Sequence, residues 1–402
     1  MGRSALMLVL GMCMIFVMIA PNLNHSASFS YQNYVDYYSA ETVHDLAESA
    51  ANMAANAVFL NPSWRGGFAT KSFWGGTYKA TVQKYPADTN KIMINAIATF
   101  QSAAETVQVL LQPSSFSKFA YYSQIEGAIY WITGDTVWGP FHTEDVMQIS
   151  GSPVFYGKVT AKKGTNPTKS SAKFYGGYQS GVGISVPADF SQVSTAASAG
   201  GKVISSGDLY IKFVQDSIYW KTSAGGSYTH AYLPTYAPNG VIYVASGNIH
   251  VLGTFKGQAT ICANGTSGST SKGNVYLDDN VQYNTDPRTN PASSDMLGIV
   301  AENNIIITDN TPNRSDINIQ ASLFSMTGGL FAENYDDRPL SGTINLLGGI
   351  SQQQRQPVGT FSGSGTLTSG FHKNYQYDNR FLVSSPPAFP NTGLFEVLSW
   401  KE

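Results

Sequence analysis

Two pairs of adjacent carboxylates are the residues in this chain whose types could do chemistry, Asp278-Asp279 and Asp336-Asp337. Glycosidases use two carboxylates that flank the scissile bond, and calcium takes carboxylate and carbonyl oxygens as ligands. Neighbouring residues of a strand point to opposite faces, so neither pair makes a carboxylate dyad by itself. We therefore predict solvated turn carboxylates that are weak candidates for a calcium or carbohydrate contact, calcium at Asp278-Asp279-Asn280, and we assign no catalytic residue.

The other reactive residue types are scattered along the chain. Its 6 His residues lack the short spacings of a zinc site, and no phosphate-binding loop is present. Of the 2 Cys residues, Cys13 lies in an apolar segment and cannot reach Cys262. His142 and His250 lie in alternating runs and are expected to face solvent. We predict no metal centre and no cofactor other than a structural calcium ion.

The composition bounds the class of protein. The 402 residues include 24 Lys+Arg and 26 Asp+Glu, so the formal net charge is −2, and charged residues make up only 12% of the chain. Without a basic excess there is no electrostatic footprint for nucleic acid, and 42% hydrophobic residues exclude wholesale disorder. With 39 Gly and 12% aromatic residues, the chain is typical of an elongated, extracytoplasmic β protein.

The N-terminal region, 1–30, carries an unbroken apolar segment from Ala5 to Ala20. Such a segment is either the core of a cleaved signal peptide, with Ser26-Ala27-Ser28 as the cleavage site, or a retained membrane helix. We favour the retained helix, because apolar residues recur at three- and four-residue steps over 40–57 until Asn61-Pro62 ends the pattern. The small residues of that stripe predict close helix–helix packing. The predicted anchor residues are Ala5, Leu8, Leu10, Ile15, Val17 and Ile19.

This N-terminal sequence, S-A-L-M-L-V-L-G-M-C-M-I-F-V-M-I-A followed by Y-Y-S-A-E-T-V-H-D-L-A-E-S-A-A-N-M-A-A-N-A, resembles the N-terminal module of PilX-kind minor type IV pilins. The resemblance implies cleavage by a prepilin peptidase between Gly2 and Arg3, a membrane anchor, and other pilin-like subunits as partners. Met7 stands where major pilins carry an acidic residue, which favours a minor pilin.

The segment after the helix alternates as strands do. Three runs within 74–112 are separated by turns at 85–90 and 101–105, which predicts an antiparallel meander. We therefore expect residues 31–115 to form a pilin-like helix with a small antiparallel sheet.

The remaining chain, 120–402, contains short β-rich runs punctuated by Gly. The kernel Gly-x-x-apolar-x-(x)-Gly recurs, which predicts a β-solenoid resembling a right-handed β-helix. A β-sandwich or jelly roll is the alternative. The expected inward residues are Val137, Val154, Ile249, Val251 and Phe255.

Within this region we expect an insertion at about 161–240, with a hairpin around Gln215-Asp216. The fold class is thus mainly β, with a long N-terminal helix and a small antiparallel sheet before the β-solenoid.

The C-terminal stretch has a distinctive order of motifs, D-x-L-G-I-V-A-E-N-N, A-E-N-Y, L-L-G-G-I, P-V-G-T-F, Y-D-x-R and S-W-K-E. It resembles a bacterial family of unknown function found C-terminal to PilX-like segments. The resemblance implies an architecture and a secretion route, and it brings no activity.

We predict a non-enzymatic, pilin-like surface or filament protein, anchored in the inner membrane, whose body lies in the periplasm or outside the cell for adhesion or assembly. The alternative is a carbohydrate-active β-helix enzyme, a polysaccharide lyase or glycosidase. Adjacent aromatics such as Tyr121-Tyr122 and Tyr130-Trp131 cannot all enter one core, so some should face outward and make carbohydrate a candidate partner.

Overall fold

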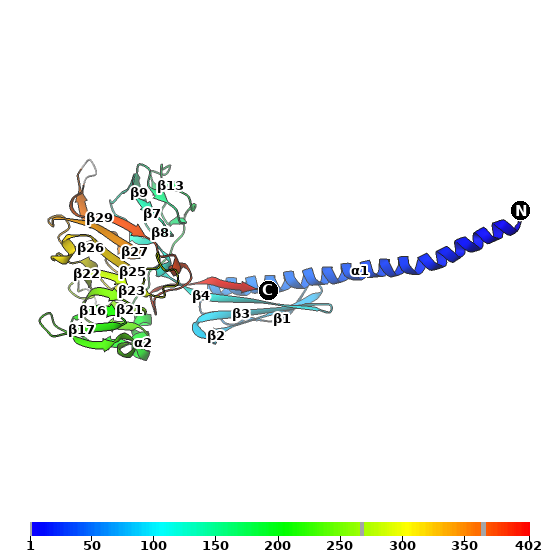
Figure 1. Cartoon of the computed structure of the whole chain (residues 1–402), viewed down its shortest axis with the longest axis horizontal. Helices are drawn as coiled ribbons and strands as arrows, with labels where there is room; N and C mark the ends of the chain where they lie inside the picture. The colour runs from blue at the N-terminus through cyan, green and yellow to red at the C-terminus, as the bar shows by residue number, and fades with distance from the viewer. Residues whose placement is uncertain (1, 266–268, 363–366) are drawn as a thin grey trace. The chain divides into compact units, whose positions relative to one another are not determined.

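The computed structural model describes residues 2–265, 269–362 and 367–402. The chain is mainly β with one long N-terminal helix (Figure 1). It divides into two compact units, Met1–Pro113 with Gly393–Glu402 and Ser114–Thr392. The second unit is therefore inserted into the first. The expected boundary of 120–402 differs at its end, because the last residues of the chain return to the first unit.

Helix α1 (Gly2–Leu60) does not end at Pro21. Every residue from Gly2 to Tyr34 is exposed, and an 18-residue window in this helix has a mean hydropathy of 2.4. Length and composition are therefore sufficient for this helix to cross a membrane. The N-terminal half extends beyond the sheet of the first unit (Figure 1).

The C-terminal half of α1 buries a stripe of small residues, among them Ala47, Ala50 and Ala54. These side chains form one core with Ile94 and Val109 of the neighbouring sheet. The expectation of helix–helix packing for this stripe is wrong, because the sheet of the same chain occupies it. Small side chains let the helix lie close to the strands.

The sheet of the first unit has the order β1-β2-β3-β4-β30. Its strands are β1 (Phe68–Phe73), β2 (Gly76–Tyr85), β3 (Asp88–Phe100), β4 (Ala103–Ser115) and β30 (Asn391–Lys401). Strands β1 to β4 pair antiparallel, which confirms the predicted meander. Alternate residues such as Ile92, Ile94 and Ala96 are buried under α1, as expected for a sheet with one covered face. Strand β30 was not foreseen.

The second unit contains a long ladder of parallel strands. In spatial order the strands are β14 (Tyr178–Ser180), β11 (Val159–Ala161), β8 (Phe141–Thr143), β5 (Tyr121–Ile125), β27 (Leu340–Gln354), β25 (Ile317–Ser325), β23 (Met296–Ala301), β21 (Gln258–Ala263), β19 (Val241–Val244) and β15 (Lys202–Ile204). The chain enters this ladder in the middle, at β5, and proceeds to β14. It then crosses to β15 and returns strand by strand to β27, which pairs with β5.

Further parallel ladders run alongside. One contains β16 (Leu209–Gln215), β20 (Ile249–Phe255), β22 (Val275–Tyr283), β24 (Ile305–Ile307) and β26 (Leu330–Ala332). Two shorter ladders contain β6 (Trp131–Ile132), β9 (Met147–Ser150) and β12 (Thr165–Asn166), and β7 (Thr136–Val137), β10 (Val154–Phe155) and β13 (Lys173–Phe174). In-register apolar residues, Leu209, Ile249, Val275, Ile305 and Leu330, stack as one buried column.

Strand β29 (Leu367–Gln376) pairs in parallel with β27, and β28 (Gly359–Phe361) pairs antiparallel with β29. Figure 1 shows β13 and β9 at one end of the second unit and β17 (Ser217–Lys221) with α2 (Ser191–Gly200) at the other. Strands β16, β17 and β18 (Thr229–Tyr232) pair antiparallel in sequence, which confirms the hairpin predicted around Gln215-Asp216.

The expected insertion at 161–240 is only partly separate from the parallel ladders. Strands β15 and β16 lie within it, and both belong to the parallel ladders. One inward residue is also misplaced by a position, because Phe155 and not Val154 pairs with Val137 and is fully buried. A shift of one residue exchanges the two faces of a strand.

The central strands of the long ladder, such as β23 and β25, are buried on both faces. Helix α2 covers the outer face of this ladder, where Val193 packs in one core with Tyr122 and Tyr243. Tyr121 and Tyr122 are therefore both buried, on opposite faces of β5. The expectation that one of these neighbours faces outward is wrong, because a segment distant in the sequence covers the second face.

A buried carboxylate, that of Glu144, fixes the segment that crosses from β14 to β15. Glu144 accepts hydrogen bonds from the Ile184 backbone N–H, from Lys162 Nζ at 2.6 Å and from His142 Nε2 at 3.0 Å. Burial opposes ionisation of Glu144, but these donors outweigh it and hold its pKa below the usual value. His142 is fully buried, so its expected solvent-facing position is wrong.

Adjacent rungs approach closely at a column of glycines. A Cβ added to Gly157 would collide with the Gly139 backbone, whereas a Cβ on Gly225 would meet no atom within 4 Å. We predict that Gly157→Ala destabilises the second unit by about 1–3 kcal/mol through overpacking, and that Gly225→Ala has little effect. Thermal unfolding of the two variants measures this. Equal melting temperatures for both variants and the parent would contradict the close approach of these rungs.

Candidate functional site

The predicted anchor residues lie in the part of α1 that has no partner in the chain. Leu8, Leu10 and Val17 are 64%, 51% and 72% exposed. Gly2, Arg3 and Ala5 are exposed as well. Exposing so many contiguous apolar side chains to water is unfavourable, so this surface requires lipid or other apolar helices around it.

The first carboxylate pair lies on β22 and is engaged in local contacts. Asp278 Oδ2 lies 3.0 Å from His250 Nδ1, and Asp278 Oδ1 accepts a hydrogen bond from Thr308 at 2.7 Å. Asp279 Oδ1 accepts a hydrogen bond from the backbone N–H of Asn280 at 2.7 Å. These contacts join neighbouring rungs and leave the proposed calcium contact a prediction.

The second carboxylate pair follows β26. Asp336 and Asp337 are exposed, and within residues 2–265, 269–362 and 367–402 their side chains make no hydrogen bond or ion pair. The adjacent Arg338 is buried and donates to the carbonyls of Ile307 and Asn313, not to either carboxylate. No contact joins the two pairs in the described part of the chain. There, too, no group of three or more His, Cys, Asp or Glu is arranged to hold a metal ion.

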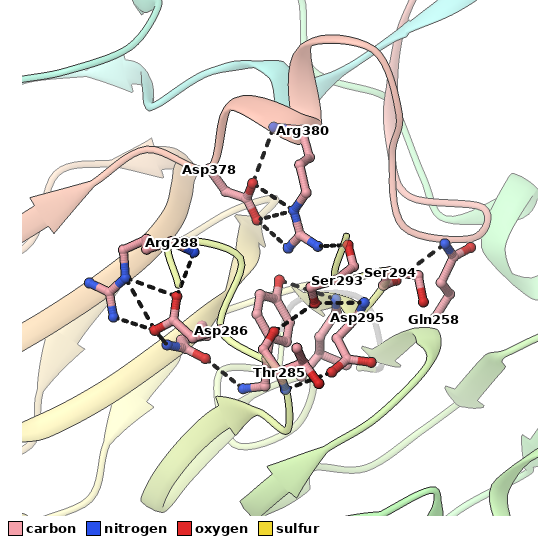
Figure 2. Close-up of polar contacts among 12 residues, drawn as sticks. Gln258, Thr285, Asp286, Arg288, Ser293, Ser294, Asp295, Asp378 and Arg380 are labelled. Carbon is pink, nitrogen blue, oxygen red and sulfur yellow. Dashed lines mark hydrogen bonds and ion pairs between the residues drawn. The ribbon is translucent and has the colours of Figure 1, made fainter. Parts of the chain in front are cut away.

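Two motifs of the C-terminal stretch, D-x-L-G-I-V-A-E-N-N and Y-D-x-R, meet in one polar cluster (Figure 2). Arg380 forms a bidentate pair with Asp378, at 2.9 Å from Nε and 2.6 Å from Nη2, and donates to the Ser293 carbonyl at 2.8 Å. Asp295 accepts hydrogen bonds from the backbone N–H groups of Gly257 and Thr285, at 2.8 and 2.9 Å.

A second pair borders this cluster, in which Arg288 lies 2.6 Å from Asp286. The hydrogen bond from Arg288 lowers the pKa of Asp286. Because Asp378 and Asp295 are buried and bonded to arginine or backbone donors, they fix the 284–295 loop and the C-terminal segment. These two motifs therefore have a structural use here.

Aromatic side chains stack along two ladders of the second unit. His250 lies between Tyr210 and Tyr276, with ring centroids 4.4 and 4.6 Å apart. Trp138, Tyr156 and Tyr175 stack in the same way, at 4.2 and 5.3 Å. The second stack is open to solvent, since its rings are 56%, 44% and 65% exposed.

A cavity of about 270 Å³ lies where this second stack ends, bordered by β7, β27 and β29. Its lining includes Trp138, Asp135, Arg355 and Lys373. Its volume is close to the lower end of the roughly 300–1,000 Å³ that small-molecule sites span.

One wall of the cavity is a buried ionic network. Arg355 Nη1 donates to Glu126 Oε2 at 3.2 Å, and the guanidinium lies 4.1 Å from the centre of the Trp131 ring. Trp131 Nε1 donates to the same Glu126 oxygen at 3.0 Å. The expectation of exposed aromatics holds for Tyr130 but not for Trp131, which is only 6% exposed. Arg355 is thus already paired, and its charge is largely neutralised.

Sequence reasoning named Tyr121 and Trp131, which line the cavity, but it did not identify Trp138, Arg355 or Lys373. A signal was nevertheless present, because Trp138-Gly139, Tyr156-Gly157 and Tyr175-Gly176 recur at steps of 18 and 19 residues. Aligning these three aromatic-glycine dipeptides with one another predicts that their rings stack. Lys373 and Arg355 carry no such signal, since they reach the cavity through pairings between distant strands.

Comparison with known proteins gives little further guidance. No protein-family model matches the chain, and no curated protein matches it. Among solved structures, the competence-associated pilin ComZ from Thermus thermophilus is similar over 90% of this chain and 97% of its own, with 12% identity and a TM-score of 0.36. A TM-score this low does not establish a common fold, so the proposals below rest on the residues of this chain.

The cluster in Figure 2 gives a direct test of its structural use. We predict that Arg380→Met destabilises the second unit by about 3 kcal/mol, because it leaves the buried Asp378 carboxylate without its partner. The matched control is Arg288→Met, whose arginine side chain is 48% exposed and whose loss should cost less than about 1 kcal/mol. Urea unfolding of both variants measures the difference. Equal effects would show that the Asp378–Arg380 pair does not fix the loop.

Proposed function

We propose that this chain is a pilin-like, membrane-anchored structural protein, whose N-terminal helix anchors it and packs against other pilin-like subunits. The observation that carries the proposal is one continuous helix with two different halves. The half from Ser39 to Val58 is covered by the sheet of its own chain, whereas residues 2–34 are apolar over most of their length and exposed. Only lipid or the helices of other subunits can cover that half.

The proposed maturation is cleavage between Gly2 and Arg3, which removes two residues and leaves the whole apolar segment in place. Arg3 then remains at the cytoplasmic flank of the helix, as expected from the preference of Lys and Arg for that side. The first unit, a helix lying on a small antiparallel sheet, supports the pilin-like assignment.

The proposed architecture of the second unit is a β-solenoid resembling a right-handed β-helix. Parallel pairing of successive rungs and columns of like side chains support this architecture over a β-sandwich, whose strands pair antiparallel. Such a body presents a long, rigid surface of low net charge. We place it in the periplasm or at the cell surface, where it serves adhesion or assembly without enzymatic activity.

The helix can be tested without disturbing the folded units. We predict that Leu10→Asp removes the protein from the membrane and sheared-surface fractions, because a carboxylate in the centre of a membrane helix costs about 2.5–3.5 kcal/mol. Its thermal unfolding should match the parent, because Leu10 is 51% exposed and lies outside the packed half of the helix. Fractionation followed by immunoblotting measures both pools.

The matched control is Ser30→Asp, which places the same charge at an exposed position of the same helix beyond the apolar segment. It should fractionate like the parent. If Leu10→Asp stays in the membrane and surface fractions in parental amounts, the apolar half is not the anchoring element.

A further inference from the structure

The cavity at the end of the exposed aromatic stack has a structural origin. Strands β13, β10 and β7 form a short ladder in which β7 is the last strand. Beyond β7 the next walls are β27 and β29, which pair with each other and belong to a different ladder. The regular stacking is interrupted there, and the interruption leaves the cavity of about 270 Å³.

The stack ends at the cavity with an aromatic surface. Tyr156 covers one face of the Trp138 ring at a centroid distance of 4.2 Å, with the planes only 12° apart. Within the described residues no other ring contacts Trp138, although the residue lines the cavity. A flat ring that is 56% exposed and has one aromatic neighbour is suited to pack against the apolar face of a sugar ring.

Lys373, Arg355 and Asp135 are the charged residues of the cavity lining, and Arg355 is already paired with Glu126. The Lys373 side chain lines the cavity and makes no hydrogen bond or ion pair within residues 2–265, 269–362 and 367–402. Lys373 is an exposed residue, although many protein atoms surround its amine. Loss of hydration caused by these atoms, with a smaller repulsion from Arg355, lowers the pKa of Lys373 to about 8, and attraction by Asp135 and Glu126 offsets part of the shift. The amine is mostly charged at neutral pH and would gain from an anionic partner.

The other polar groups match hydroxyl groups better than further charges. The carboxylate of Asp135 is held in the wall by the backbone N–H of Ile132 at 3.0 Å. Amide side chains of Gln356 and Asn374 also line the cavity. Amide groups both donate and accept hydrogen bonds with sugar hydroxyls, and a carboxylate accepts hydrogen bonds from them. A polyanion such as nucleic acid is disfavoured by Asp135 and by the net charge of −2.

We propose that this cavity binds an acidic sugar residue, with its carboxylate on Lys373 and its ring against Trp138. Extended glycans would continue over the exposed edges of Tyr156 and Tyr175. This inference gives the adhesion named above a ligand class, and it rests on the proposed function only for where the body is displayed. Binding itself does not involve the N-terminal helix.

The test uses the full chain in detergent. Binding is then measured independently of whether the N-terminal helix anchors the protein in a membrane. The probes are the methyl glycosides of glucuronic acid, galacturonic acid and N-acetylneuraminic acid, with methyl glucoside as the neutral counterpart of the first. We expect at least one acidic glycoside to bind, as measured by calorimetry, and methyl glucoside to bind at least tenfold more weakly. Affinity for the acidic glycoside should fall at least tenfold between pH 6.5 and pH 9.5.

Matched variants assign the site. Lys373→Met and Trp138→Ala should each weaken binding at least tenfold, whereas Lys158→Met, at an exposed lysine outside the cavity lining, should leave it unchanged. Because the side-chain amine of Lys373 makes no hydrogen bond within the described residues, and the substitution leaves the backbone pairing of β29 intact, the variant should unfold at the parental temperature.

Three results would overturn the proposal. The first is that none of the three acidic glycosides binds, and the second is that binding survives Lys373→Met. The third is that acetate or a single-stranded oligonucleotide competes at the same site as well as the glycoside, which would assign it to simple anions or to nucleic acid.

Discussion

The structure depends on an apolar surface that the chain cannot cover by itself. Residues 2–34 of α1 are exposed, whereas the same helix from Ser39 onward is buried against its own sheet. An uncovered apolar helix of this length is unfavourable in water, so its environment must be lipid or other helices. The sheet of the first unit then has a clear use, since it covers one face of the second half of the helix.

A second constraint explains the unusual path of the chain in the second unit. Strands β4 and β30 are neighbours in one sheet, so the inserted unit must begin and end at nearly the same place. Thr392 Oγ1 indeed donates to the Ser114 carbonyl at 3.2 Å. If the chain added rungs in order from one end of the stack to the other, the first and last residues of the inserted unit would lie far apart. Entry at β5, in the middle of the ladder, and return at the adjacent β27 bring both ends together.

The same path limits what the sequence could predict. The helix to Leu60, the meander and the hairpin at Gln215-Asp216 follow from local periodicity and turns, and they were predicted. The predictions that His142 and one residue of Tyr121-Tyr122 face solvent were wrong. Helix α2 and the segment before it cover a face of the long ladder that the local sequence pattern leaves open. The return of β30 to the first unit and the cavity around Lys373 both require pairing between distant segments, which no local pattern reveals.

The measurement that tests the central claim most directly is the mass of the mature N-terminal peptide from membrane and sheared-surface fractions. We predict a chain that starts at Arg3 and retains the whole apolar segment. A chain that starts near Phe29 would contradict the account, because the uncovered half of α1 would be gone. An intact Met1 would retain the anchor and contradict the pilin-type cleavage between Gly2 and Arg3.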